Sequence, residues 1–381
     1  MKVLIAGDYS PRWGLQSILQ KREWNRVLES VLPFTQACDI AIVNFETTVR
    51  PGTAVPIRKC GPNLSAPPES VGALKYAGFN VVTLANNHFY DYGMEGMQVS
   101  LKLFEKEGIE YVGAGKNLAE AQKTLFLERD KERVAIINCC EHEFSIATTN
   151  EGGCNPLNPI QQYYAIRDAR EKADYVVVIV HGGHEHYQLP SIRMQDAYRF
   201  FVEAGADCVI NHHQHCFSGM ELWKGKPIFY GLGNFLFDER GAGLKDTWYA
   251  GYMVVLDFEK DKLSYEIVPY RQCDGKPGVH PFSDTKERKS FQAIFYELNG
   301  IICNRDRLED CQRKYYSEQV KSRLAVFEPW RSRIMKVAYN RGWLPSMIRG
   351  NSVAPMMNYI VCESHRDIVQ YALTQKIKSE K

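Results

Sequence analysis

Short apolar runs alternate with segments of helical periodicity over the first 270 residues. Runs such as VLIA, IAIV and YVVVIV are short and rich in β-branched residues, which is typical of buried strands. A helix is predicted over 93–107, where Gly108 provides a suitable end. Near-continuous apolar strands that alternate with helices predict an α/β fold. Further helices are expected near 24–32, 68–77, 161–173 and 195–204.

The last strands of this region have a different pattern. PIFYGLGNFLF (227–237) is predicted to be one strand with Asn234 in a glycine-lined bend. The successive runs AGYMVVLDF (250–258) and KLSYEIVPY (262–270) suggest a closing antiparallel pair. The segment 141–158 is polar and predicts an irregular connection.

A polar residue follows the apolar body of each of six predicted strands. In α/β sheets the functional site lies outside the carboxyl ends of the strands, so these residues are expected to converge there. Unrelated polar strand ends are the alternative, and they explain six such positions poorly. The six residues are Asp8, Glu46, Asn87, His181, His213 and Asn234.

The densest of these positions is the pentapeptide NHHQH at 211–215, which follows the apolar run AGADCVI. If the segment is extended, His213 and His215 project to the same side, because side-chain direction repeats every two residues. Two neutral imidazoles on one side suit a divalent transition metal. A polar loop with a chance histidine cluster is the alternative.

Composition narrows the class of protein. The 381 residues carry a net charge of +2, which does not indicate a nucleic-acid-binding protein. The 11 cysteines include no CxxC pair and favour a reduced compartment over a disulfide framework. No signal peptide is visible, and no apolar run approaches the roughly 18 residues of a transmembrane helix. A soluble cytoplasmic protein is therefore expected.

The charge balance changes after about Gly275. Residues 281–381 hold 18 Lys and Arg against 11 Asp and Glu, whereas the chain before them is acidic. Asp284 and Glu287 are spaced as a helix capping pair. We therefore expect two parts, a main domain over 1–275 and a helical C-terminal extension over 276–381.

The ordered motifs resemble a known family. IVNFETTV, GFNVVTLANNHFYDYG, YVGAG, HGGHEHY, AGADCVINHHQH and IFYGLGNFLFD are similar to those of the CapA-type capsule-synthesis (PGA_cap) family, associated with poly-γ-glutamate. This family is a branch of the calcineurin-like metallophosphoesterase superfamily. The resemblance covers roughly residues 1–270. It implies a layered αββα sandwich and a centre of two divalent ions, with Mn, Zn, Fe or Mg as candidates.

The resemblance also implies ligand roles. Glu46 would bridge the two ions, since a carboxylate can span metals about 3.5–4 Å apart. One site would be completed by Asn87, His181 and His213. The other would use Asp8 and His215.

Further residues are implied to act on the substrate. His88 would protonate the leaving group, with Asp91 orienting its imidazole. Glu185 matches a family acid that is either catalytic or supports the ligands. Lys59 and Asn234 are candidate substrate contacts; the alternatives are a solvated lysine and a structural turn.

Some positions depart from the pattern or have no assigned role. The superfamily usually continues its first motif as Asp-x-His, whereas this chain, like CapA-type proteins, lacks the histidine and has Ser10. The site at Asp8 therefore has one strong ligand fewer. His184, His186 and His212 match no family role and are expected to make local hydrogen bonds.

Two functions follow from these residues. The leading hypothesis is a metal-dependent hydrolase of capsule or surface-polymer synthesis that acts on an anionic phosphoester or a γ-glutamyl amide, either a small molecule or a polymer. The alternative is a non-catalytic assembly or scaffolding factor for a polymer synthetase, with a relic metal site. Polymer-synthesis proteins are possible partners in either case.

Overall fold

The computed structural model describes residues 1–52, 54–239, 246–259, 262–325, 327–330, 332–348 and 353–379. By compactness the chain divides into two units, Met1–Leu308 and Glu309–Lys381. Among the described residues, no helix combines the length and the apolar character needed to cross a bilayer.

The first unit contains an eight-stranded mixed sheet. Its strand order is β16-β15-β14-β1-β2-β3-β4, and β13 pairs in parallel with the end of β1. The parallel strands β1, β2 and β3 are nearly continuous in apolar residues, as strands covered on both faces must be, and β4 extends the sheet in parallel beside β3. The bounds are β1 Lys2–Tyr9, β2 Ile40–Phe45, β3 Val81–Thr83, β4 Glu110–Val112, β13 Asn234–Leu236, β14 Ala250–Glu259, β15 Lys262–Gln272 and β16 Val279–Pro281.

A six-stranded sheet faces the first one. Its order is β11-β12-β10-β9-β7-β6, and its central strands β12, β10, β9 and β7 are parallel. Tyr175 of β9 stacks on Phe258 of β14 with ring centroids 4.3 Å apart, so side chains of the two sheets meet directly. The bounds are β6 Leu125–Arg129, β7 Glu132–Cys140, β9 Tyr175–His181, β10 Cys208–His212, β11 Met220–Trp223 and β12 Lys226–Phe229; a small separate sheet pairs β5 Ala114–Gly115 with β8 Gly153–Cys154.

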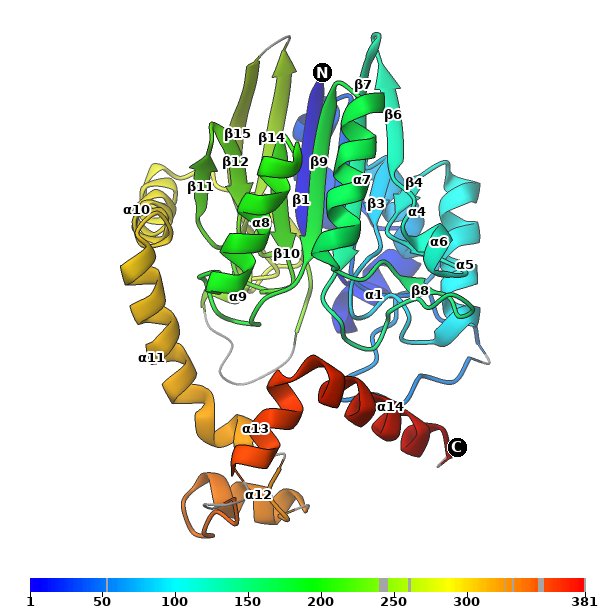
Figure 1. Ribbon diagram of the computed structural model, residues 1–381. Coiled ribbons are helices and arrows are strands. Elements are labelled where there is room, and N and C mark those ends of the chain that lie inside the picture. Colours follow the sequence, from blue (N-terminus) through cyan, green and yellow to red (C-terminus); the bar gives the residue numbers. More distant parts are fainter. Residues whose placement is uncertain are drawn as a thin grey trace. The chain divides into compact units, whose positions relative to one another are not determined.

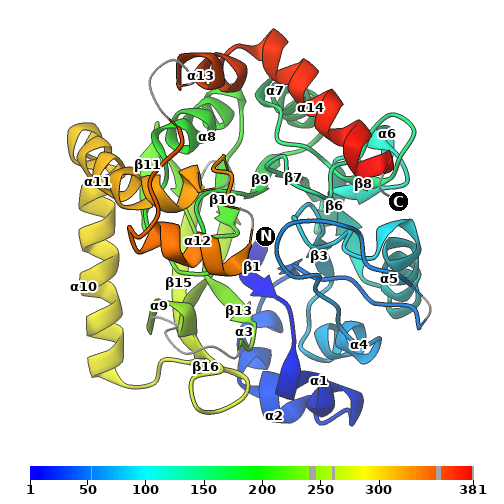
Figure 2. The ribbon, with the colours of Figure 1, turned by 90° about the horizontal axis from the view of Figure 1, so that it is seen from below.

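Helices cover the outer faces, which completes the four-layered αββα arrangement of the first unit (Figures 1 and 2). Helices α7 and α8 lie on the six-stranded sheet, and α1, α4 and α5 lie on the outer side of the eight-stranded sheet. The bounds are α1 Trp13–Gln20, α2 Asn25–Leu28, α3 Leu32–Thr35, α4 Glu69–Tyr76, α5 Gly93–Glu107, α6 Leu118–Ala121, α7 Pro159–Lys172, α8 Ile192–Ala204, α9 Asp246–Tyr249 and α10 Thr285–Ile302, with a 3-10 turn at Glu29–Val31.

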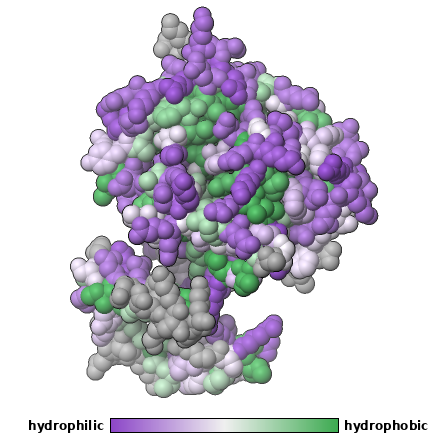
Figure 3. All heavy atoms as spheres, turned by 90° about the vertical axis from the view of Figure 1, so that its right-hand side faces the viewer, coloured by the Kyte–Doolittle hydropathy of each residue, from purple (hydrophilic) through white to green (hydrophobic). Residues whose placement is uncertain are grey.

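Helix α5 packs on the sheet through residues that recur at helical spacing in the sequence. Its buried residues include Met97, Ser100 and Phe104, which recur at helical spacing and face the sheet. It ends at Gly108, whose φ of 64° is left-handed, as the sequence predicts. Figure 3 views this side of the molecule, where hydrophilic residues cover most of the surface and apolar residues show in patches between them.

The predicted strand 227–237 is two strands in different sheets. β12 belongs to the six-stranded sheet, and β13 pairs with β1 of the other. The chain crosses between the sheets near Gly233, which has a φ of 79° and lies beside backbone atoms that a Cβ would approach to 2.9 Å. Asn234 thus begins a strand instead of following one. The antiparallel pair of β14 and β15 is present as predicted.

Helix α10 belongs to the compact first unit, although the sequence-based boundary at residue 275 precedes it. The side chain of Asp284 caps α10 by accepting from the Lys286 N–H. Phe291 and Phe295 are buried, and their rings lie 5.9 and 5.5 Å from that of Tyr252 in β14. The division at residue 275 remains a prediction.

The second unit is helical. Helix α11 (Arg305–Leu324) enters it from the first unit, and α12 (Arg333–Asn340), α13 (Val353–Val361) and α14 (Glu363–Ser379) follow. The side chain of Ser332 caps α12 by accepting from Met335 N–H.

Candidate metal centre

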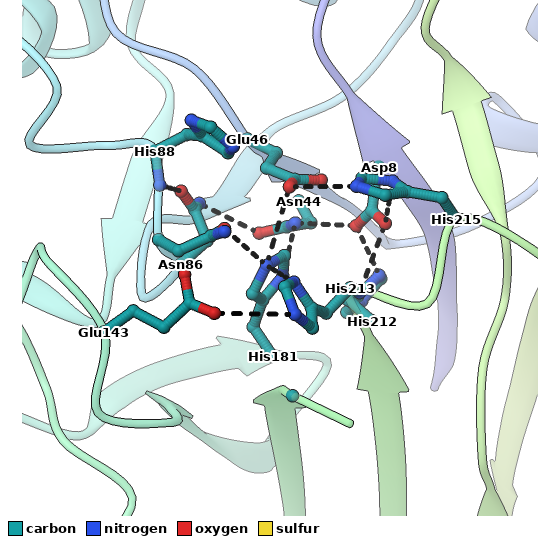
Figure 4. A network of polar contacts seen from close by, with 12 residues as sticks. Asp8, Asn44, Glu46, Asn86, His88, Glu143, His181, His212, His213 and His215 are labelled. Carbon is teal, nitrogen blue, oxygen red and sulfur yellow. Dashed lines mark hydrogen bonds and ion pairs between the residues drawn. The ribbon is translucent and has the colours of Figure 1, made fainter. Parts of the chain in front are cut away.

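Side chains from both sheets converge where the carboxyl ends of β1, β2, β9 and β10 meet (Figure 4). Glu46 follows β2 of the eight-stranded sheet, and His181 ends β9 of the six-stranded sheet. The Nε2 of His181 lies 3.6 Å from Oε1 of Glu46, and the Nε2 of His215 lies 3.6 Å from the same oxygen. The Glu46 carboxylate therefore stands between imidazoles that arrive from two directions.

Two groups of ligand atoms have the spacing of a metal site. One contains Glu46, His181 and His213, and the other contains Asp8, Glu46 and His215. Within each group the ligand atoms lie within 4.8 Å of one another, and all these residues are buried. Glu46 is common to both groups, which is the arrangement of a carboxylate shared by two ions.

The amide of Asn87 adds an oxygen to the first group. Its Oδ1 lies 3.0 Å from the Nε2 of His181. The Nδ1 of His213 also lies 3.0 Å from this nitrogen. Oxygen and nitrogen atoms that crowd one point in this way suit a divalent ion.

The Glu46 carboxylate lacks a hydrogen-bond donor among the described residues, which favours a metal ion as its partner. It is fully buried, and among the described residues no hydrogen-bond donor is paired with either oxygen. Burial raises the pKa of Glu46 well above its usual value, and the neighbouring Asp8 raises it further. A buried carboxylate without a partner is costly, and a coordinated cation would remove that cost. The donor set therefore fits a divalent metal.

Asp8 is the better satisfied carboxylate. Its Oδ1 accepts from Asn44 Nδ2 at 2.7 Å and lies 3.2 Å from His212 Nδ1, and its Oδ2 accepts from the His213 N–H at 3.2 Å. Burial alone would raise the pKa of Asp8, but the imidazoles of His212, His181 and His215 together hold that pKa well below the usual value, with His212 the largest of the three. Asp8 is therefore the ionised member of the carboxylate pair.

The histidines are arranged as neutral ligands. Burial lowers the pKa of His181 well below its ordinary value, and the nearby His213 lowers it further. Burial lowers the pKa of His215 to about 4 despite the opposing charge of Asp8. The Nδ1 of His215 lies 2.9 Å from Asn234 Oδ1, which orients the ring and leaves Nε2 toward Glu46. A metal requires its imidazole ligands in the neutral form.

The backbone at His213 and His215 differs from the expectation. Strand β10 ends at His212, so the two histidines do not share one side of an extended segment. Their φ values are 89° and 54°, in the left-handed region that residues with a Cβ seldom adopt. The prediction of an extended pair is wrong, because a loop with a left-handed backbone brings the imidazoles to the site.

The candidate proton donor is part of a buried triad. His88 Nδ1 lies 2.7 Å from Asp91 Oδ2. Lys59 forms an ion pair with Asp91 Oδ1, and its Nζ lies 3.0 Å from His88 Nδ1. The side chains of Lys59 and Asp91 are 2% and 0% exposed. The Lys59 ammonium is thus engaged with Asp91 instead of lying free in solvent.

The remaining sequence candidates lie at the edge of the centre. Glu185 is exposed; partial desolvation raises its pKa, but the nearby imidazoles, chiefly those of His215 and His213, bring that pKa below its ordinary value. His186 is exposed too, and its ring centroid lies 6.1 Å from that of His215. Ser10 is fully buried, and its hydroxyl has no hydrogen-bond partner among the described residues.

Sequence reasoning missed several contacts of the site. Asn44 bonds to Asp8, and its Nδ2 also lies 3.2 Å from His181 Nδ1. His212 was expected to have only a local role, yet it lies against Asp8. Glu143, from the irregular segment after β7, lies 4.0 Å from His213 Nε2. For Asn44 the signal was its position near the end of β2, two residues before Glu46; for Glu143 there was none.

Comparisons with known proteins give a consistent family. Residues 2–239 match the family model described as "Bacterial capsule synthesis protein PGA_cap". The chain is 30% identical to the capsule biosynthesis protein CapA of Bacillus anthracis, over 85% of this chain and 80% of that protein. It is 31% identical to the PGA biosynthesis protein CapA of Bacillus subtilis, over 65% of this chain and 66% of that protein. A solved phosphatase structure from Mycoplasma pneumoniae aligns with a TM-score of 0.45 and 16% identity, over 76% of this chain and 96% of that one.

Proposed function

Because this chain belongs to the bacterial capsule synthesis protein family PGA_cap, we propose that it is a metal-dependent hydrolase of capsule or surface-polymer synthesis. Its substrate is an anionic phosphoester or a γ-glutamyl amide of a polyglutamate-type polymer. The observation that carries this proposal is the buried Glu46 carboxylate, which has no hydrogen-bond partner among the described residues and lies 3.6 Å from imidazole nitrogens of His181 and His215.

In this proposal Glu46 would be a ligand to both of two divalent ions. Asn87, His181 and His213 would complete one site, and Asp8 and His215 would contribute to the other. Ions bound there would supply Lewis-acid stabilisation of negative charge that develops on the substrate. The elements that hold these ligands belong to two different sheets, so the packing of the sandwich sets the distance between the ligand groups.

The proton chemistry is assigned to His88. Its Nδ1 is held by Asp91 Oδ2 at 2.7 Å, so Nε2 is the atom left to give a proton to the leaving group. Lys59 neutralises the charge of Asp91, which without it would be a buried, incompletely paired carboxylate. In our proposal Lys59 and Asn234 border the substrate, and Glu185 stands at the exposed rim as an acid beside His215.

The test is metal analysis combined with turnover. The purified chain is stripped with a chelator and reloaded separately with Mn, Zn, Fe or Mg. It is then assayed against a panel of phosphoesters and γ-glutamyl amides, with Glu46→Gln as the matched variant. We expect metal-dependent turnover of one substrate class and its loss in the variant. Equal turnover by both proteins, or turnover that survives chelation, contradicts the proposal.

One observation favours a second function, a non-catalytic assembly factor for a polymer synthetase. Ser10 stands two residues after Asp8, where the superfamily has a histidine, and a neutral hydroxyl is a weaker ligand for transition metals than an imidazole. A single bound ion, with no turnover of either substrate class, would support this alternative.

A further inference from the structure

Three loops that carry candidate ligands need external support. They follow β9, β10 and β12: the first begins after His181, the second contains His213 and His215, and the third leads to Asn234 at the start of β13. The left-handed backbone at His213 and His215 persists only where surrounding contacts over-determine it. The source of this support is a residue outside the proposed ligand set.

Asn211 lies where the three loops meet. It is fully buried, and its Nδ2 is within hydrogen-bond distance of three backbone carbonyl oxygens, those of Gly182 (2.9 Å), His212 (2.7 Å) and Tyr230 (3.2 Å). Gly182 directly follows His181 and His212 directly precedes His213, whereas Tyr230 directly follows β12. The Asn211 Oδ1 accepts from the Tyr198 hydroxyl at 2.6 Å. One carboxamide therefore ties the ends of β9, β10 and β12 together.

The carboxamide is itself held in place. Tyr198 stacks on Tyr230 with ring centroids 5.8 Å apart and an interplanar angle of 11°. The Tyr230 hydroxyl donates to Glu221 Oε1 at 2.7 Å, and Arg199 binds both oxygens of Glu221 at 2.9 and 2.6 Å. This chain of contacts runs from helix α8 to the site and leaves Asn211 little rotational freedom.

We propose that Asn211 is the positioning residue of the metal centre. By fixing the Gly182 and His212 carbonyls, it sets the separation of the His181 and His213 imidazoles. It thereby keeps the His181 Nε2 and the His213 Nδ1 directed at the same ion position. This inference rests on the proposed metal function. Asn211 does not touch the ion; it acts through the loops that carry the ligands.

The experiment compares four proteins by metal affinity and by fold stability. Asn211→Asp removes the amide donors and keeps an acceptor for Tyr198, and Asn211→Leu removes both without adding charge. Asn80→Asp is the matched control. Its amide also joins backbone groups, because Oδ1 accepts from Ala41 N–H at 2.9 Å and Nδ2 donates to Asp39 O at 3.2 Å, but it lies at the opposite end of β2.

We expect both Asn211 variants to bind Zn²⁺ 10- to 100-fold more weakly than the wild type, because mutation of residues that support metal ligands commonly lowers metal affinity by this factor. The visible spectrum of the Co²⁺-loaded protein should change, because it reports ligand geometry. Asn80→Asp should lower the thermal midpoint at most, with metal affinity and spectrum unchanged. Unchanged Zn²⁺ affinity and Co²⁺ spectrum in a folded Asn211 variant would overturn the inference.

Hydrogen exchange of the metal-free proteins separates this inference from the metal function. Both Asn211 variants should exchange faster than the wild type at the backbone amides of Gly182–Gly183 and His213–His215, whether or not the wild type binds metal. If the wild type binds no metal and the variants exchange at the wild-type rate, both proposals fail. If the wild type binds metal but the variants exchange at the wild-type rate, only the inference about Asn211 fails.

Discussion

The Nε2 of His181 and the Nδ1 of His213 lie 3.0 Å apart. His181 ends β9, and His213 directly follows the neighbouring strand β10 of the same sheet. Both side chains are buried, and the pKa of His181 is held well below its ordinary value. Two neutral imidazoles can occupy this spacing by sharing one proton or by turning both lone pairs toward one cation. The nearby Glu46 oxygen favours the cation.

The first prediction tests the position of the centre. His213→Ala removes one imidazole of the Glu46, His181 and His213 group and should lower metal affinity at least tenfold. His186→Ala is the matched control, because His186 is exposed and lies outside both ligand groups. Elemental analysis and titration of both variants check this. Equal losses would mean that the centre lies elsewhere.

The second prediction separates chemistry from binding. His88→Gln should retain the metal content of the wild type and lose about 10²- to 10⁴-fold in turnover, because the proton donor is gone while the ligands remain. Asn87→Ala, by contrast, should lose metal. A metal loss in His88→Gln that matches that of Asn87→Ala would make His88 a ligand.

The third prediction concerns Ser10. Ser10→His places an imidazole two residues after Asp8, as in the Asp-x-His motif of metallophosphoesterases, so it should tighten the weaker of two metal-binding steps. Ser10 is fully buried, so the larger ring also requires neighbouring side chains to move. Isothermal titration checks the affinity, and circular dichroism checks the fold. An unchanged second step in a folded variant would show that this edge of the site is built differently.

The fourth prediction concerns the buried ion pair of Lys59 and Asp91. Lys59→Met leaves the Asp91 carboxylate buried without its cation, which should destabilise the protein by about 3–5 kcal/mol. Lys172→Met is the control, because its ion pair with Asp168 is exposed and should contribute about 0–1 kcal/mol. Urea unfolding measures both.

A second change makes this prediction sharper. Adding Asp91→Asn to Lys59→Met removes the stranded charge and should recover part of the lost stability. If Lys59→Met costs no more than the exposed control, the Lys59 ammonium is not buried against Asp91.

The sequence anticipated elements whose cause is local. Gly108 ends α5 because a glycine can adopt the left-handed backbone, and the apolar runs of β1, β2 and β9 are buried on both faces. The family resemblance correctly indicated the αββα layers. These features depend on residues close together in the chain, or on motifs that stay in order.

Other contacts depend on residues far apart in the chain. His212 lies against Asp8, 204 positions earlier in the numbering, and no periodicity predicts which histidine of the cluster does so. The crossing from β12 to β13 depends on β1, whose last residues Asp8 and Tyr9 pair with β13 beyond the stretch that pairs with β14. The burial of Lys59 against Asp91 likewise depends on how the loop before α4 folds back on the site.

The fifth prediction tests the central claim, that the buried Glu46 carboxylate, which has no hydrogen-bond donor among the described residues, serves as a metal ligand. Thermal unfolding is followed for the wild type and Glu46→Gln, each with chelator and each with added Mn²⁺ or Zn²⁺. Binding at 100 times the Kd should stabilise the wild type by about 2.7 kcal/mol. With chelator the variant should be at least as stable as the wild type, because it removes a buried carboxylate whose pKa is raised. Added metal should then stabilise the wild type and leave the variant unchanged. A variant that is stabilised as much as the wild type would contradict the account.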